Sequence, residues 1–168
     1  MVEKNRTCAF TGHRMEKLPW RDNESDPRCV DLKNRIYDAV RTAYQSGITH
    51  FICGMATGCD MYFCEAAIAL REERPDVTIE AAIPFDGPSR GWDESLRRRH
   101  SRLVEDCDYL TVVQHEFSPN CFTRRNHYMV DNSCLLIAAY NGRPGGTMNT
   151  LVYAVRQGLD VIELGVEN

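Results

Sequence analysis

The chain has 168 residues, of which 43% are hydrophobic and 26% are charged, and its formal net charge is −4 with an isoelectric point near 5.7. This size is typical of one globular domain, so we expect residues 1–168 to fold as a single unit. The sequence has no long apolar run and no leader-like N-terminus, which predicts a cytoplasmic protein without a membrane segment. The acidic total gives no general attraction for nucleic acid or anionic lipid.

The chain alternates between short β-branched runs and longer stretches with helical periodicity. Strands are predicted at residues 7–11, 49–53, 77–83, 108–113, 134–139 and 160–164. Apolar residues recur at intervals of three and four in the helical stretches 36–43, 63–70 and 96–104, and in a shorter stripe of Leu151, Ala154 and Val155. The pattern predicts an α/β fold, namely a single-domain Rossmann-like three-layer sandwich with a mainly parallel sheet and helices on both faces.

The eight cysteines do not follow a disulfide or zinc pattern. Cys8, Cys53 and Cys134 lie in apolar, strand-like runs, and the sequence has no CxxC pair and no Cys/His cluster at zinc spacing. We therefore expect reduced thiols that act as small core residues, and no metal site.

Three strands run into loops rich in small residues, within segments 7–14, 51–60 and 136–147. Parallel strands end at one edge of their sheet, so these loops are expected to meet there, where open α/β sheets bind ligands. Glycine lets the backbone approach a ligand, and the helix that follows points N–H groups at an anion. The sequence therefore predicts an anion site at this edge.

The loop 142–147, Gly-Arg-Pro-Gly-Gly-Thr, is the strongest candidate for a phosphate nest. Pro144 fixes the approach of the chain, and Gly145 and Gly146 allow successive N–H groups to converge on one point. Thr147 is expected to cap the helix. The alternative is a Pro-Gly turn with an ordinary threonine cap, and the position after a buried strand favours phosphate binding.

The other two loops supply polar side chains. Arg14 suits bidentate contact with phosphate, Thr11 a short hydrogen bond, and Asp60 either a ribose or base edge or the first turn of its helix. His13 fits a base, a contact to a nucleobase or an ordinary loop residue. The spacing around Gly54 and Gly58 matches neither the dinucleotide fingerprint nor a P-loop.

Three charged or aromatic features have two interpretations each. The basic run at 97–100 is flanked by acidic residues, which favours a solvated, self-compensating helix face over a polyanion site. Arg124 and Arg125 begin a helix and either join the site or pair with surface acids. The long loops 15–28 and 84–92 carry Trp20 and Trp92. These loops either form lids over a site or are anchored to the surface by their tryptophans.

Taken in order, the motifs resemble those of the DUF1273 family, which includes the YpsA-like proteins and belongs to the SLOG superfamily of Rossmann-like domains. The resemblance extends from residue 7 to residue 164. It rests on Thr-Gly-His-Arg at 11–14, Gly-Met-Ala-Thr-Gly-Cys-Asp at 54–60, Ile-Pro-Phe at 83–85, Trp92, Arg-Asn at 125–126, Met-Val-Asp at 129–131, the glycine loop at 142–147 and Tyr-Ala at 153–154.

The resemblance implies a protein that binds a nucleotide or nucleotide-derived ligand, such as ADP-ribose, NAD or a nucleoside monophosphate, and acts as a sensor or regulator. It implies no required cofactor, and a protein partner or a second copy of the chain as further partners. The candidate ligand-binding residues are Thr11, Gly12, Arg14, Gly54, Met55, Gly58, Asp60, Pro84, Phe85, Arg125, Asn126, Gly142, Gly145, Gly146 and Thr147.

Two related groups supply the alternatives. The LOG phosphoribohydrolases carry PGGxGTxxE, whereas residues 144–151 here lack the further glycine and the acid. Glycosidic cleavage develops positive charge on the sugar, so the missing carboxylate favours binding over hydrolysis. A hydrolase would have to use Asp60, Glu65 or His13. Binding of single-stranded DNA, as in DprA, would need a basic stripe that the acidic total does not promise.

Overall fold

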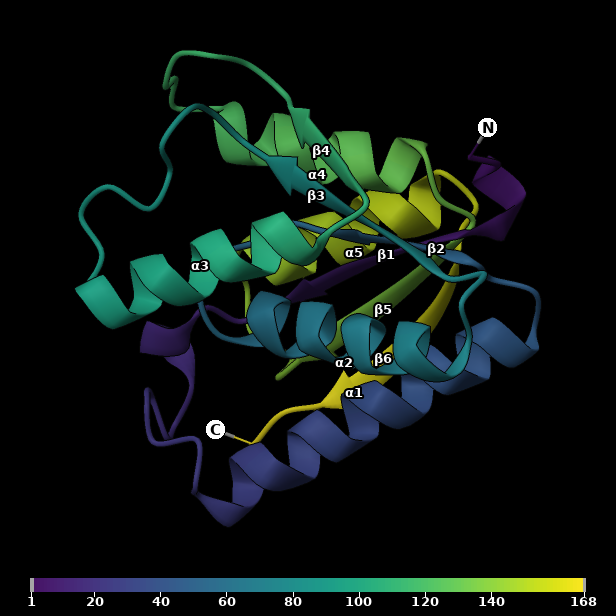
Figure 1. Ribbon diagram of the computed structural model, residues 1–168, viewed down its shortest axis with the longest axis horizontal. Coiled ribbons are helices and arrows are strands. Elements are labelled where there is room, and N and C mark those ends of the chain that lie inside the picture. The colour runs from purple at the N-terminus through teal and green to yellow at the C-terminus, as the bar shows by residue number, and fades with distance from the viewer. Residues whose placement is uncertain (1, 168) are drawn as a thin grey trace.

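The computed structural model describes residues 2–167 and contains one sheet of six parallel strands in the order β4-β3-β2-β1-β5-β6 (Figure 1). Its elements are the 3₁₀ helices η1 (Lys4–Arg6) and η2 (Met15–Lys17), the strands β1 (Thr7–Gly12), β2 (His50–Cys53), β3 (Thr78–Ile83), β4 (Tyr109–Val112), β5 (Leu135–Tyr140) and β6 (Asp160–Gly165), and the helices α1 (Pro27–Gln45), α2 (Cys59–Glu73), α3 (Glu94–Asp106), α4 (Cys121–Asp131) and α5 (Gly146–Arg156). The predicted strands, helices and fold class are confirmed.

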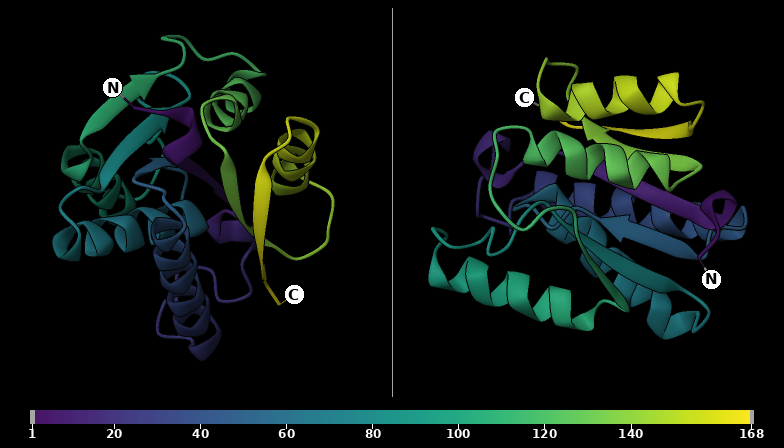
Figure 2. Two further views of the ribbon diagram at one scale, coloured as in Figure 1. Left: turned by 90° about the vertical axis from the view of Figure 1, so that its right-hand side faces the viewer. Right: turned by 90° about the horizontal axis from the view of Figure 1, so that it is seen from above.

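The sheet lies between two layers of helices. Helices α1, α2 and α3 pack on one face, and α4 and α5 pack together on the other (Figure 2). The larger core cluster lies under α1–α3, where the ring of Phe10 stacks on Phe63 with centroids 4.6 Å apart. A smaller cluster under α4 and α5 includes Met129 and Leu136. The sheet is therefore buried on both faces, as parallel sheets are in α/β proteins.

Local sequence signals set the ends of the longest helix. Asp26 precedes α1, and its side chain accepts a hydrogen bond of 2.9 Å from the backbone N–H of Arg28, while Pro27 occupies the first helical position. Gly47 follows the helix with a φ of +111°. An acidic cap, a proline at the first position and a glycine after the end are the usual boundaries of a helix.

One expectation about an apolar residue is wrong, and one alternative is decided. Val155 is 60% exposed, because α5 packs over β5 and the edge strand β6 and leaves part of its surface in solvent. Of the two interpretations of Trp20, a lid or an anchor, the structure supports the anchor, since Trp20 is buried and its Nε1–H donates to the hydroxyl of Tyr62 at 3.2 Å. This contact anchors the loop 15–28 on α2.

All eight cysteines have free thiols in the structure, with Cys8 and Cys53 buried in the core and Cys134 half-buried. The described residues contain no cluster of three or more His, Cys, Asp or Glu side chains placed to hold a metal ion. Nor does any helix within residues 2–167 combine the length and apolar character needed to cross a bilayer.

The loops after β1 and β2 interlock through two glycines. A Cβ on Gly12 would lie 2.5 Å from the Cβ of Cys59, and a Cβ on Gly58, whose φ is +80°, would lie 2.7 Å from the backbone nitrogen of Met15. The N–H of Cys59 donates to the carbonyl of His13 at 3.2 Å. The start of α2 can approach the end of β1 this closely only because neither position carries a side chain.

We expect Gly12→Ala to lower the free energy of unfolding by about 1–3 kcal/mol, the usual cost of forcing an extra carbon into a packed contact. Urea denaturation measures the change. Gly165→Ala is the matched control, because it lies at the end of β6 with open space around its Cβ position. Its effect should stay within about 0.5 kcal/mol. Equal effects of the two substitutions would contradict the interlocking of the loops.

Candidate functional site

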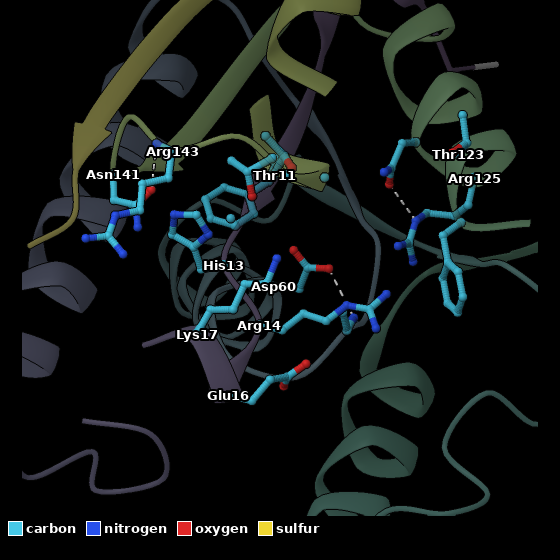
Figure 3. Close-up of a pocket in the computed structure, with 18 of the residues that line it drawn as sticks. Thr11, His13, Arg14, Glu16, Lys17, Asp60, Thr123, Arg125, Asn141 and Arg143 are labelled. Carbon is cyan, nitrogen blue, oxygen red and sulfur yellow. Dashed lines mark hydrogen bonds between the residues drawn. The ribbon is translucent and has the colours of Figure 1, made fainter. Parts of the chain in front are cut away.

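A cleft of about 590 Å³ opens at the carboxyl ends of the strands (Figure 3). It is lined by the loops that follow β1 and β5, by the start of α2 and by the first turns of α4 and α5. Strands β1 and β5 are neighbours in the sheet, and β2 lies on the other side of β1, so the strand order reverses here. Such a reversal point is where open α/β sheets bind ligands.

The structure brings most of the predicted site residues together around this cleft. In Figure 3, Asn141 and Arg143 lie on one side, Arg125 lies on the opposite side, and Arg14 and Asp60 lie between them. The predicted ligand-binding residues that line the cleft are Thr11, Gly12, Arg14, Asp60, Arg125, Asn126, Gly145, Gly146 and Thr147. The catalytic candidate His13 lines it as well.

Six predicted ligand-binding residues lie elsewhere. Gly54, Met55 and Pro84 line an adjoining cavity, whereas Gly58, Phe85 and Gly142 line neither space. Gly58 serves the contact between loops, and Phe85 packs edge-on against Phe117 and Phe122 at centroid distances of 5.4 and 6.2 Å. Gly142 has a φ of +84° and shapes the turn that leads into α5.

The third catalytic candidate, Glu65, lies outside the cleft. Its carboxylate is 2.6 Å from a guanidinium nitrogen of Arg99, and Arg99 also pairs with Glu24. Arg98 of the same basic run pairs with Glu94 on its own helix. The run at 97–100 is therefore compensated by acidic residues, as the sequence indicates, and Glu65 is committed to this network.

Several cleft residues were not singled out from the sequence. Lys17 belongs to the short helix η2, for which the sequence offers no periodic signal. Asn141 directly follows β5, and Arg143 lies within the predicted glycine loop, so their place shortly after a strand is the signal that could have identified them. Phe122 comes from the first turn of α4, next to the arginines that the sequence did indicate.

The first turn of α5 faces the cleft without a side-chain cap. Gly145 occupies the cap position and Gly146 begins the helix, and no side chain accepts a hydrogen bond from this end. The expectation that Thr147 caps α5 is wrong, because Thr147 lies one residue inside the helix. The first N–H groups of a helix have no partners within it. This end of α5 is therefore suited to an anion.

Most of the charged side chains around the cleft are cationic, although the whole chain carries a net charge of −4. The cationic members are Arg14, Lys17, Arg125 and Arg143, and the carboxylates are Glu16 and Asp60. The guanidinium of Arg14 lies 4.7 Å from the ring centroid of Phe122, a cation–π contact that orients it. The excess of positive charge is thus local to the cleft.

Arg125 and Asp60 form the buried part of the wall. Arg125 donates to the carbonyl of Gly54 and to Oδ1 of Asn126, the latter at 2.9 Å, while the N–H of Ala56 donates to Asp60 at 3.0 Å. Burial lowers the pKa of Arg125 and raises the pKa of Asp60, and the attraction between their charges opposes both shifts. These bonds fix the loop after β2 to α4.

His13 provides a polar atom without a partner. Its side chain is 8% exposed, and its Nε2 forms no hydrogen bond with any residue in the part of the chain that the structure describes. Burial lowers the pKa of His13, Asn141 opposes the shift by hydrogen bonding, and Lys17 adds to it. The lowered pKa favours the neutral imidazole at pH 7, and a buried nitrogen without a protein partner is available for a hydrogen bond to a ligand or water.

Comparisons with known proteins agree with this architecture. The chain is 27% identical over 142 residues to the uncharacterized SPbeta prophage-derived protein YoqJ of Bacillus subtilis (strain 168), covering 77% of this chain and 83% of that protein. It is 23% identical over 144 residues to the UPF0398 protein YpsA of the same organism, covering 84% of this chain and 79% of that protein.

Among solved structures, DNA processing protein A (DprA) from Streptococcus pneumoniae matches with a TM-score of 0.63 at 17% identity. The match covers 98% of this chain but about half, 52%, of that protein, and it shows a common fold. A family model, described as the YspA SLOG family, matches residues 8–159. Since that match takes in most of the chain, including every strand from β1 to β5, the chain belongs to the YspA SLOG family.

Proposed function

We propose that this protein binds a nucleotide or nucleotide-derived ligand, with a phosphate group in the cleft, and acts as a cytoplasmic sensor or regulator. ADP-ribose, NAD and nucleoside monophosphates are the candidate ligands. The observation that carries the proposal is the convergence of the uncapped start of α5, four cationic side chains and the unpartnered Nε2 of His13 on one cleft.

Each part of this arrangement suits phosphate. The N–H groups at the start of a helix bind phosphate oxygens, and the helix dipole adds to that attraction. Arg14 and Arg143 offer guanidinium groups that can make paired hydrogen bonds to two oxygens. A volume of about 590 Å³ is in the usual range for small-molecule sites.

The second candidate function is hydrolysis of an N-glycosidic bond. The observation in its favour is that a buried carboxylate, Asp60, and a neutral imidazole, His13, line the same cleft. Against it, the first turn of α5 carries no acidic residue, and Asp60 already accepts a hydrogen bond from Ala56. Binding without cleavage is therefore the preferred proposal.

Binding of single-stranded DNA is the third candidate, raised by the fold shared with DNA processing protein A. A strand of DNA needs cationic and aromatic groups along an open groove. Here the cationic groups Arg14, Lys17, Arg125 and Arg143 surround one cleft, in a chain whose net charge is −4. This distribution supports a small anionic ligand rather than a polymer.

We expect isothermal titration calorimetry to show binding of at least one of AMP, ADP-ribose and NAD, and Gly146→Leu to abolish it. The new side chain would obstruct the start of α5, while the open space around Gly146 should leave the fold intact. Gly165→Leu is the matched control, because Gly165 is exposed at the end of β6. Unchanged affinity in Gly146→Leu, with an unchanged melting temperature, would remove the glycine loop from the site.

Arg14→Ala should weaken binding of the same nucleotide by about 1.5–3 kcal/mol, the scale of a hydrogen bond to a charged group. The loss should shrink at high salt, because part of it is charge attraction. Arg97→Ala serves as the control, since Arg97 is exposed on α3 and away from the cleft. Equal affinities of the two variants would show that Arg14 does not contact the phosphate.

Mass spectrometry of the nucleotide after incubation separates binding from hydrolysis. We expect the ligand to be recovered intact, because α5 presents no carboxylate to stabilise positive charge on the sugar. Release of free base would establish hydrolysis instead. In that case Asp60→Asn should suppress the release while calorimetry still detects binding.

A further inference from the structure

A second cavity, of about 350 Å³, adjoins the cleft and differs from it in character. The two spaces share Arg14, Glu16, Ala56, Phe122 and Arg125, so they are continuous. Away from the cleft, the second cavity is lined by the apolar side chains of Met55, Pro84, Pro88, Trp92 and Leu96, together with the polar residues Thr57 and Asp93. The cationic cleft and the second cavity therefore meet at Arg14 and Phe122.

Trp92 forms part of the apolar wall, and its ring is supported by the ring of His100. Its ring meets the ring of His100 edge-on, with centroids 5.3 Å apart and planes at 88°. Burial lowers the pKa of His100, so this support is a neutral ring at pH 7. The backbone N–H of Trp92 donates to the carbonyl of Ser89 at 3.0 Å, which closes a turn before α3. The indole is thus positioned at the cavity before any ligand arrives.

The boundary between the two spaces is also ordered. The guanidinium of Arg14 lies 4.7 Å from the ring centroid of Phe122. The Phe122 ring also packs edge-on against Phe117, with centroids 6.5 Å apart. A ligand that crosses this boundary would pass a fixed positive charge lying against an aromatic ring. That combination suits a molecule whose charged and planar parts are joined by a short linker.

We propose that the Trp92 cavity, defined by Met55, Pro84, Pro88, Trp92 and Leu96, binds the planar base of the nucleotide whose phosphate lies in the cleft. The inference rests on the proposed function and deepens it, because it sets the ligand class. The ligand has its base and its phosphate in separate spaces, with the sugar passing Arg14. Indole and phenyl rings are the usual partners of a nucleobase, since every base offers a π face.

The competing arrangement places the whole nucleotide in the cleft. In that arrangement Trp92 would contact no part of the ligand. Substitution of Trp92 would then change the affinity for the nucleotide and the affinity for a fragment without the base to the same extent. AMP and ribose 5-phosphate differ by the base alone. A comparison of these two probes therefore distinguishes the two arrangements.

The chain has two tryptophans, which allows the site to be observed directly. Trp20 is buried, bonded to Tyr62 and absent from both spaces, so Trp20→Phe leaves Trp92 as the single indole fluorophore. We expect AMP to change the fluorescence of Trp20→Phe and to leave that of Trp92→Phe unchanged. Ribose 5-phosphate should change neither. Thermal melts of both variants verify that they are folded.

Calorimetry with full-length Trp92→Ala supplies the affinity test. We expect AMP to bind about 5- to 150-fold more weakly than to the unchanged protein, the range typical of one stacked base, and ribose 5-phosphate to bind the variant and the unchanged protein equally well. Undiminished AMP affinity, or an equal loss for both probes, would overturn the Trp92 cavity as the base site. If Gly146→Leu still abolished binding in that case, the proposed function would stand. Failure of the unchanged protein to bind either probe or any candidate nucleotide would overturn the proposed function together with this inference.

Discussion

The close approach of the first two βα loops is the constraint on which the rest of the cleft depends. Gly12 and Gly58 allow the start of α2 to lie against the end of β1, and the bond from the N–H of Cys59 to the carbonyl of His13 fixes the distance. The same contact places His13 beside the cleft and brings Asp60, the second residue of α2, into the cleft wall. A larger residue at either glycine would separate the two sides of the site without touching a ligand.

Positive charge is concentrated in the cleft, where hydrogen bonds to protein oxygen atoms stabilise it. Arg125 is buried, and two of its N–H groups donate to the carbonyl of Gly54 and to Oδ1 of Asn126, so its charge is supported by oxygen atoms of the protein. Asp60 partly balances this charge, although burial raises the pKa of its carboxyl. A cationic cleft can therefore exist in an acidic protein, which is favourable for discrimination between a small anion and a polymer such as DNA.

The sequence was sufficient for the fold because the apolar periods and the glycine loops are local signals. It also indicated which loops would meet, since parallel strands end at one edge. It could not indicate that Gly58 serves packing between loops, that Phe85 joins an aromatic cluster or that Glu65 pairs with Arg99, because these depend on contacts between distant segments. The misplaced cap at Thr147 has a different cause, namely an error of two residues in the start of α5.

The preference for binding over cleavage follows from what surrounds the carboxylates that line the cleft, Glu16 and Asp60. Glycosidic cleavage needs an acidic group beside the sugar carbon, where positive charge develops. Glu16 is exposed on η2, and Asp60 is held by the N–H of Ala56 in a loop that α4 fixes through Arg125. The start of α5 instead shares the cleft with cations, including Lys17 and Arg143, and the Nζ of Lys17 lies 3.4 Å from the position of a Cβ on Gly145. In the proposed function, such a site would stabilise the negative charge of a phosphate equally before and after any reaction, which strengthens binding but does not lower a barrier.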